Sequence, residues 1–586
     1  MIRQAPVISP AAGSILIAFI LLVAILPYWY QCRMTSGTWA VDFWSIWLLG
    51  SVCWMQLART RNLGNIFRHR IWLVTSALVL LSWAYNDTTD RHSGDAVLSF
   101  FCLSGVYFSL RQWADSNIWK WLATGIAASS LIQFVPGLSQ STGGNRLSVM
   151  ARFHNSGYFA SYLLAVVPLA FALAVEKKAG MMSRLFFLGV TLVGLYLLFA
   201  TGARASWLGM LVIVLTAAGI ACLGYVSKLT RIAWMVSGAA LFLLLFIALF
   251  YWRPGSAFGR LTIYRTAIEI IKNHPVFGVG PNRFPAVYGI YQSRLFERNE
   301  FPPGYEMLAT DSFEAFDLPL QLGVELGLGG MVVFGFWLFS VRDTLRRIGP
   351  GANSSLFRFT SGCTLAGLFA ASLFSNTFHS TPVLLLTVFH LAVVGSPAEK
   401  TNRPFWGRLA GIMMALALTA FSIWRTGLQW RATRLWDQAV RLAGYGNYTA
   451  SRPLYERAYR DLKSDGAFLF NFGAEACING EYAKAIRLLE RARIYAAAGP
   501  VYLYLGDAYA GAGRYTEAEA AYLRAIYMVP AKLYPRYQLV RLYRNWGRKM
   551  EAEKWTQQIL SSGVKIRSET TDRILEDLRA HTRPKQ

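Results

Sequence analysis

The sequence predicts an all-α protein, in which a polytopic bundle of about 12–13 transmembrane helices is followed by a soluble α-solenoid. Up to about residue 425 the chain is a series of apolar runs of roughly 17–25 residues, the length that spans a hydrocarbon core. After residue 430 the composition changes to Ala, Arg, Glu, Leu and Tyr at helical spacing. We therefore divide the chain into a membrane domain, residues 1–425, and a C-terminal domain, residues 430–586. A single soluble domain is excluded, because 54% of the 586 residues are hydrophobic and only 15% are charged.

Thirteen apolar runs are long enough to be counted as spans. The first run is long and is not followed by a small-residue cleavage pattern, so we expect a retained helix and not a signal peptide. The predicted spans cover residues 11–30, 38–57, 71–86, 96–112, 118–136, 157–175, 182–201, 205–225, 232–252, 318–341, 356–375, 380–396 and 407–424.

The loops between these runs predict the orientation. With a cytoplasmic N-terminus, six short loops lie inside and each is basic, for example "EKKAGMMSR" and "RDTLRRIG". The long segment 253–317 then lies outside, as the positive-inside rule requires. Much of the net charge of +26 is accounted for in this way, so nucleic acid need not be invoked, although anionic lipid is a fitting neighbour. We expect the inner membrane of a bacterium, with residues 430–586 in the periplasm.

The C-terminal domain contains an internal repeat. The segments "GNYTASRPLYERA", "GEYAKAIRLLERA", "GRYTEAEAAYLRA" and "GRKMEAEKWTQQI" begin at Gly446, Gly480, Gly513 and Gly547. A period of 33 to 34 residues, with Gly at the turn and Ala where two helices pack, is typical of tetratricopeptide repeats. Such arrays present a surface for a protein or peptide partner.

Ionisable residues near the outer ends of spans are costly to place and therefore indicate function. Four such segments stand out. They are "RLSVMARFHNSGYFASYLLAVVPLA", "TGARASWLG", "GRLTIYRTAIEIIKNHPVFGVGPNRFPAVY" and "TDSFEAFDLPLQLGVELGLGG".

Together these segments resemble the O-antigen ligase and polymerase superfamily, which includes bacterial O-oligosaccharyltransferases. "NSGYFASYL", "TGARASWLG", "HPVFGVGP" and "LQLGVELGLGG" follow the family's motifs in order, over roughly residues 140–395. The resemblance implies a GT-C-like membrane domain, and tetratricopeptide tails also occur in this superfamily. It further implies a glycosyltransferase that moves an undecaprenyl-diphosphate-linked glycan to lipid A core, a growing polysaccharide or a protein hydroxyl.

By the same resemblance, arginines bind the diphosphate and no metal or other cofactor is expected. A planar guanidinium can hold two phosphate oxygens and stabilise the charge that develops on the leaving group. The candidates are Arg204, Arg260 and Arg265. We expect Arg204 and Arg265 to face one cavity open to the outer leaflet. The alternatives are an interfacial arginine that snorkels to head groups and the solvated face of an amphipathic helix.

The family's proposed catalytic base is a histidine, and Phe316 stands in its place, with Asp317 at the following Asn position. Asp317, Glu314 or Asp311 would serve as base if burial raises the carboxyl pKa. His379, in "SNTFHSTP", is the other candidate, its alternative being a packed structural histidine. We expect Asp317 or His379 on the wall of the cavity, and structural roles for His274 and His390.

The missing histidine leaves a second function open. A non-catalytic relative would act as a membrane scaffold that recruits periplasmic partners through its repeats. A transporter or channel would predict charged residues in the middle of spans, and the predicted spans hold almost none.

Overall fold

The structure is a computed structural model, and the residues it describes are helical with no strand among them. The described residues are 13, 15–23, 38–59, 70–86, 90–112, 116–143, 147–153, 155–177, 179–223, 227–252, 254–347, 356–395, 405–565 and 567–582.

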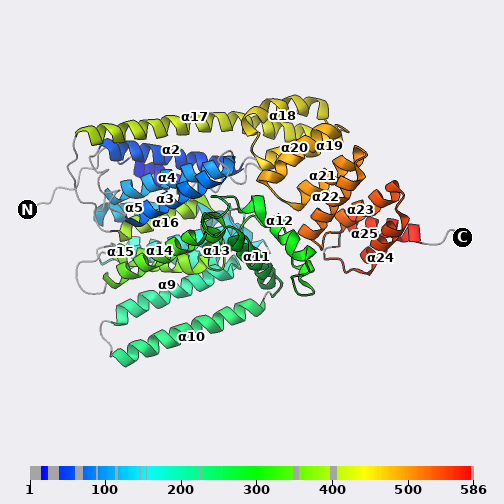
Figure 1. The fold of residues 1–586 in the computed structure, drawn as a ribbon. Helices are drawn as coiled ribbons and strands as arrows, with labels where there is room; N and C mark the ends of the chain where they lie inside the picture. Colours follow the sequence, from blue (N-terminus) through cyan, green and yellow to red (C-terminus); the bar gives the residue numbers. More distant parts are fainter. Residues whose placement is uncertain are drawn as a thin grey trace, which may run out of the picture.

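The membrane domain is a bundle of long apolar helices (Figure 1). Its helices are α2 (Thr38–Arg59), α3 (Arg70–Tyr85), α4 (Arg91–Gln112), α5 (Ser116–Ser129), α6 (Leu131–Thr142), α7 (Ser156–Ala174), α8 (Met181–Ala200), α9 (Arg204–Leu223), α10 (Lys228–Trp252), α14 (Leu328–Arg347), α15 (Leu356–Ser372) and α16 (Thr381–Val394). The core is centred on α7, which is buried along most of its length.

Six helices within the described residues have the length and composition to cross a membrane. They are Arg91–Gln112, Ile118–Thr142, Ser156–Ala174, Met181–Ala200, Arg204–Ala221 and Leu229–Trp252. Each coincides with a predicted span, and together they give the protein the build of a multi-pass membrane protein. The predicted spans at 38–57, 71–86, 318–341, 356–375, 380–396 and 407–424 also fall on helices, and their crossing of the membrane stays a prediction. The predicted span 11–30 lies partly outside the described residues.

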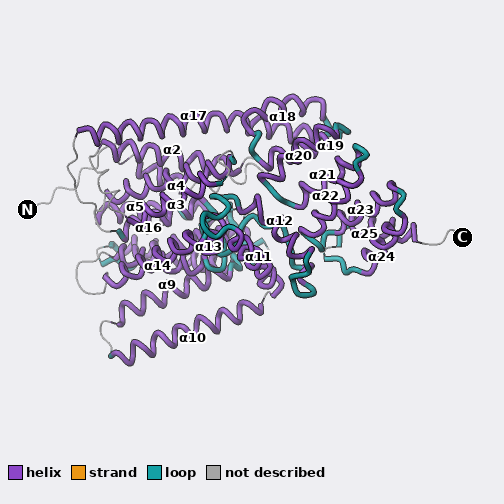
Figure 2. The backbone as a smooth tube through the Cα atoms, in the orientation of Figure 1, coloured by secondary structure: helices purple, strands orange, loops and turns teal. Residues whose placement is uncertain are grey.

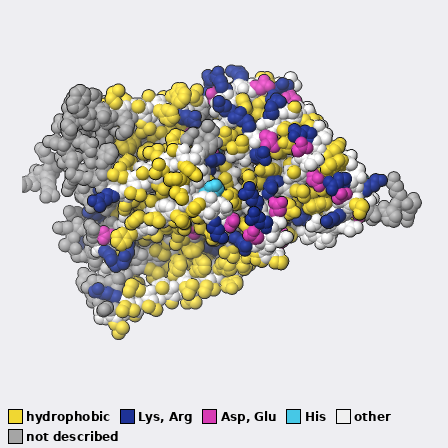
Figure 3. All heavy atoms as spheres, viewed as in Figure 1, with side chains coloured by type: hydrophobic (Ala, Val, Ile, Leu, Met, Phe, Trp, Pro, Cys, Tyr) yellow, Lys and Arg dark blue, Asp and Glu magenta, His cyan; other side chains and the backbone are white. Residues whose placement is uncertain are grey.

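The outward face of the bundle is apolar. Helix α10 buries almost none of its side chains, and Leu243 and Leu244 are more than half exposed. In Figure 3 the hydrophobic side chains cover the membrane domain, whereas Lys, Arg, Asp and Glu gather over the C-terminal helices. A helix that is hydrophobic all round suits a lipid environment.

The predicted span 318–341 is broken at Gly327 into α13 (Leu318–Leu326) and α14. Gly327 has a φ of 72°, and a Cβ there would lie 2.4 Å from the Val276 carbonyl oxygen. The break lets the two family-like motifs pair through their backbones: the Val279 amide donates to the Val324 oxygen at 2.8 Å, and the Leu328 amide donates to the Pro275 oxygen at 2.9 Å. "HPVFGVGP" and "LQLGVELGLGG" therefore form one structural unit.

The segment between α10 and α13, residues 254–317, folds against this unit, and we call it the outer segment after the side of the membrane that the sequence predicts for it. It contains α11 (Pro254–Asn273), α12 (Phe284–Glu297) and the short 3-10 helix η2 (Tyr305–Met307). Its Ile263, Ala267 and Phe284 share a small core with Val324 of α13.

The C-terminal array consists of stacked helical pairs (Figures 1 and 2). The first member is the end of α17 (Phe405–Gly444), a helix that runs from the membrane domain into the array. The others are α18 (Tyr448–Leu462), α19 (Gly466–Ile478), α20 (Tyr482–Tyr495), α21 (Gly499–Gly511), α22 (Tyr515–Met528), α23 (Leu533–Trp546), α24 (Lys549–Ser561) and the closing α25 (Glu569–Thr582).

The predicted helical hairpins are confirmed. Gly446, Gly480, Gly513 and Gly547 lie between the paired helices, with φ angles between 73° and 81°. Glycine adopts this left-handed conformation without the steric cost that a Cβ brings. The repeat period was visible in the sequence because each turn needs a glycine at the same place.

Candidate functional site

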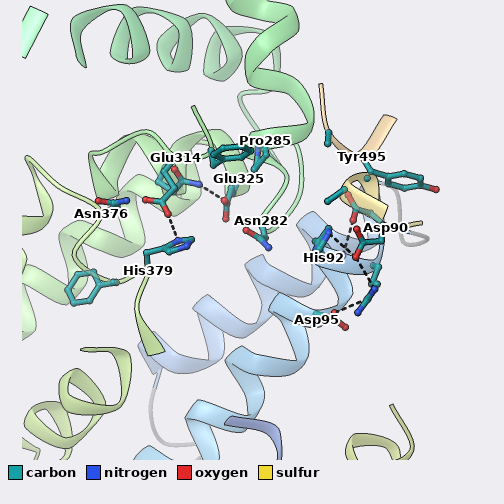
Figure 4. A pocket seen from close by; sticks show the side chains of 18 of the residues that line it. Asp90, His92, Asp95, Asn282, Pro285, Glu314, Glu325, Asn376, His379 and Tyr495 are labelled. Atoms are coloured by element: carbon teal, nitrogen blue, oxygen red, sulfur yellow. Dashed lines mark hydrogen bonds and ion pairs between the residues drawn. The ribbon is translucent and has the colours of Figure 1, made fainter. Parts of the chain in front are cut away.

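A cavity of about 520 Å³ lies where the membrane domain, the outer segment and the C-terminal array meet. Its lining comes from the start of α4, the segment 313–325, the turn between α15 and α16, and the facing sides of α17, α19 and α20. Figure 4 shows two polar groups in it, His379 with Glu314 at one end and His92 with Asp90 and Asp95 at the other. Asn282 and Glu325 lie between them.

His379 and Glu314 are in direct contact at the first end. Nδ1 of His379 contacts Oε1 of Glu314, and both side chains are largely buried. The ring of Tyr158 stacks on the imidazole with ring centres 5.4 Å apart. The Tyr158 hydroxyl accepts a hydrogen bond from Asn376 Nδ2 at 3.2 Å. A carboxylate on Nδ1 fixes the ring orientation and stabilises an imidazolium, the arrangement that makes the other ring nitrogen a good proton acceptor.

The chain that carries Glu314 is held in a constrained conformation. The Ser312 hydroxyl donates to the Glu314 carbonyl oxygen at 2.7 Å, and the Ala315 amide donates to Gln321 Oε1 at 2.8 Å. Phe316 follows with a φ of 54°, which is unusual for a bulky side chain. Such strain persists only where the surroundings over-determine it, and it is common at functional sites.

Phe316 and Asp317 line the same cavity, but each also has a structural contact. The guanidinium of Arg260 lies over the Phe316 ring, 5.4 Å from its centre. Asp317 caps α13 by accepting from the Leu320 amide at 2.8 Å. Burial raises the pKa of the Asp317 carboxyl, and the hydrogen bond from Leu320 partly opposes this rise. The structure thus brings Asp317, Glu314 and His379 together as candidate bases.

His274, His390 and Asp311 lie outside the cavity. His274 Nε2 is 3.1 Å from the Tyr291 hydroxyl, and His390 Nε2 is 3.1 Å from the Ala165 carbonyl oxygen. Neither lines the cavity. Asp311 points to the C-terminal array, where it accepts hydrogen bonds from Lys532 and from the Gly499 amide.

Arg204 and Arg260 both lie beside the first turns of α11. Arg204 donates to the Leu249 carbonyl oxygen at 2.6 Å and to the Ser256 hydroxyl at 3.2 Å. Arg260, one turn after Ser256, is mostly buried and donates to the Phe374 carbonyl oxygen. Burial lowers the pKa of its guanidinium. Through Phe316, Arg260 touches the wall of the cavity.

Arg265 points in a different direction from Arg260. It is half exposed, pairs with Glu300 at 3.7 Å and lies over the Phe301 ring. Five residues along an α-helix turn the side chain by about 140°, so Arg265 and Arg260 occupy different faces of α11. None of Arg204, Arg260 and Arg265 is among the residues that line this cavity, so that Arg204 and Arg265 share a cavity with Asp317 or His379 stays a prediction.

The second polar end of the cavity was missed by the sequence analysis. Arg91 donates to Asp465 at 2.9 Å and lies 3.7 Å from Asp95, and His92 is 3.8 Å from the same Asp465 oxygen. Burial by itself raises the pKa of Asp465, but His92 and Arg91 hold it below the usual range. The charged stretch "DRHSGD" at the head of a span was a visible signal, whereas its partner in α19 was not.

Two further contacts neutralise this end. Arg283 lies 3.1 Å from Asp90, and Arg425 lies 3.2 Å from Asp95. Burial raises the pKa of Asp90, with His92 and Arg283 acting in the opposite direction. The cluster joins α4, the outer segment, α17 and α19, so it ties the array to the membrane domain.

A model of a known protein family matches part of the chain. Residues 188–335 match the family described as O-antigen ligase. This match supports a place for the chain in the O-antigen ligase superfamily. The matched segment includes three of the four motifs and carries Arg204, Arg260, Arg265, Glu314 and Asp317, whereas His379 and the array lie outside it. No curated protein matches the chain.

Proposed function

We propose that the protein is a membrane glycosyltransferase of O-antigen ligase type. The family match suggests glycan transfer at a membrane. The observation that carries the proposal is the His379–Glu314 pair on the cavity wall, next to the phenylalanine that stands in the place of the family's histidine. This pair supplies a base from the α15–α16 turn in place of the one that is missing at Phe316.

The chemistry follows from the pair. The acceptor hydroxyl gives its proton to the imidazole of His379, and its oxygen forms a bond to the anomeric carbon of the donor sugar. The bond from that carbon to the diphosphate oxygen breaks, and the electron pair leaves with the diphosphate. Glu314 stabilises the imidazolium while the proton is held.

The charged side chains indicate where each part of the two substrates binds. Within the part of the chain that the structure describes, the cavity wall carries six carboxyl groups, those of Asp90, Asp95, Glu314, Asp317, Glu325 and Asp465, and one arginine, Arg91. Carboxylates and amides accept hydrogen bonds from sugar hydroxyls, whereas ionised carboxylates repel a diphosphate. We therefore assign the hydroxyl-bearing part of the substrates to the cavity and the diphosphate to Arg204 and Arg260, beyond Phe316. Arg265 is a less direct candidate because it faces Glu300.

The remaining parts of the proposal concern the setting. The donor is an undecaprenyl-diphosphate-linked glycan, and the acceptor is lipid A core, a growing polysaccharide or a protein. The protein lies in the inner membrane, and the array is a tetratricopeptide solenoid in the periplasm that receives a protein or peptide partner. The basic short loops and the repeated glycine turns support this setting.

A transfer assay with purified full-length protein tests the proposal. His379→Gln removes the base while keeping a polar side chain, and we expect transfer to fall by about 10²–10⁴-fold with donor binding retained. Glu314→Gln should give a smaller loss, and Asp317→Asn, which keeps an acceptor for the Leu320 amide, should leave most transfer intact.

The alternative is a non-catalytic scaffold, which the phenylalanine at position 316 favours. If the unaltered protein binds donor but transfers no glycan to any of the three acceptor classes, the scaffold function takes the place of the enzyme. Full activity in both His379→Gln and Asp317→Asn would show that neither residue is the base.

A further inference from the structure

The C-terminal array is packed closely on the outer segment. The Ala497 amide donates to the Pro285 carbonyl oxygen at 3.2 Å. A Cβ on Gly289 would lie only 2.1 Å from the Ala497 oxygen, so the two backbones touch where α12 has no side chain. Arg524 donates to the Ser293 hydroxyl at 3.0 Å. The face of α12 toward the array is therefore an interface and not a free surface.

Asp311 of the outer segment is held directly by the array. Its Oδ1 accepts from the Gly499 amide at 3.1 Å, and its Oδ2 accepts from Lys532 at 2.7 Å. Gly499 is the first residue of α21, so the carboxylate also lies at the positive end of a helix. Two charge-assisted contacts and a helix terminus fix this one side chain.

Glu314 lies three residues after Asp311, and a hydrogen bond within this short stretch restricts its conformation. The Ser312 hydroxyl donates to the Glu314 carbonyl oxygen at 2.7 Å. Residues 298–317, by contrast, contain only the single turn η2. A segment with so little regular structure depends on outside contacts to keep a side chain in one position.

We propose that the array positions Glu314 against His379 by holding Asp311 with Lys532 and the Gly499 amide. The positioning residues are Asp311, Lys532 and Gly499. The array therefore contributes to the geometry of the transfer site in addition to binding a partner. The inference rests on the proposed function for the role of Glu314, whereas the hold on residues 298–317 is independent of it.

The test uses full-length protein and two measurements, hydrogen exchange of the peptide 298–317 and the kcat and KM of glycan transfer. Asp311→Ala removes both contacts and should raise exchange by about tenfold or more. Asp311→Asn keeps an acceptor for the Gly499 amide, and Lys532→Met keeps the carboxylate. Each should raise exchange by about two- to fivefold. Lys532→Arg keeps the positive charge and should show the same exchange as the unaltered protein. The matched control is Lys549→Met, which alters an exposed lysine of the same array.

The transfer rate separates positioning from catalysis. In Asp311→Ala we expect kcat to fall by roughly tenfold with little change in KM for the donor, because a small displacement of a catalytic group slows the reaction. The acidic limb of the pH profile should stay in place, since Asp311 is not the base. Unchanged hydrogen exchange in Asp311→Ala would overturn the inference. Raised exchange with an unchanged kcat would also overturn it, and so would loss of the acidic limb from the pH profile of transfer. If the unaltered protein transfers no glycan, the proposed function fails, while the exchange measurement still decides whether the array holds the segment.

Discussion

The ion pair between Arg91 and Asp465 should hold the array on the membrane domain. The Arg91 Nη1 and Asp465 Oδ2 atoms are 2.9 Å apart, and the two side chains are 7% and 6% exposed. Asp465 also caps α19, because its Oδ1 accepts from the Phe468 amide at 3.0 Å. Asp465→Asn keeps the cap and removes the charge, so it isolates the ion pair.

Removing one partner of a buried pair leaves the other charge buried without compensation, which costs about 3–5 kcal/mol. Asp95 lies 3.7 Å from Arg91 and retains part of the compensation, so we expect about 3 kcal/mol for Asp465→Asn. Arg91→Met should cost a similar amount, because it leaves Asp465 with His92 alone. The double variant should cost less than the sum of the two, since it leaves neither charge of the pair behind.

The pH dependence has a defined sign. The pKa of Asp465 is lower in the folded protein than in the unfolded chain. Its contribution to stability is therefore fully present above the ordinary aspartate pKa of about 4 and is lost as the pH falls below it. Asp465→Asn should lose this part of the acid sensitivity.

A double-mutant cycle measures the pair. Urea unfolding and hydrogen exchange in α19 and α20 are both measured on the full-length protein in detergent. Asp437→Asn, on α17 near the same junction but not on the cavity wall, serves as a comparison for the loss of a buried acid. Additive effects of Asp465→Asn and Arg91→Met, or a cost below about 1 kcal/mol for each, would refute the reasoning.

Three other predictions follow from single features. Gly327→Ala should destabilise the fold by about 2 kcal/mol or more in urea unfolding, because φ is 72° and the added Cβ meets backbone, whereas Gly335→Ala in α14 has open space and should be neutral or slightly stabilising. Arg204→Lys should reduce transfer nearly as much as Arg204→Ala, because an ammonium cannot present a bidentate fork, and the exposed Arg487→Lys is the control that should match the unaltered protein. A reporter active only in the cytoplasm should be silent when fused after residue 586 and active when inserted at residues 348–355, and the reverse pattern would invert the topology.

The features that the sequence predicted are those set by local chemistry. The array turns were visible because Gly446, Gly480, Gly513 and Gly547 each occupy a left-handed position that disfavours other residues. The six confirmed candidate spans were visible because apolar length is a property of one segment at a time. Arg204 was placed at a helix end because the turn that precedes it is short.

The contacts that the sequence could not predict join residues far apart in the chain. Arg91 and Asp465 are 374 residues apart in the chain, and the local sequence around either residue does not indicate the other as its partner. Glu314 and His379 were both named as candidate bases, but their pairing depends on how the α15–α16 turn folds over the outer segment. The different contacts of Arg265 and Arg260 could not be predicted from their shared segment, because five residues of helix separate their two directions.

In the proposed function, the surroundings of Phe316 explain how a protein without the family's histidine carries out transfer. The guanidinium of Arg260 lies over the Phe316 ring, and Phe316 itself lines the cavity. A histidine there would place a second titrating base beside the same arginine. Because His379, paired with Glu314, supplies the base from the α15–α16 turn, residue 316 need not be a base and can be an apolar partner of Arg260. Phe316→His should therefore weaken the hold on Arg260 without replacing His379, so the double variant Phe316→His with His379→Gln should remain inactive in the transfer assay. Recovery of transfer in that double variant would show that the base belongs at position 316 and that His379 is structural.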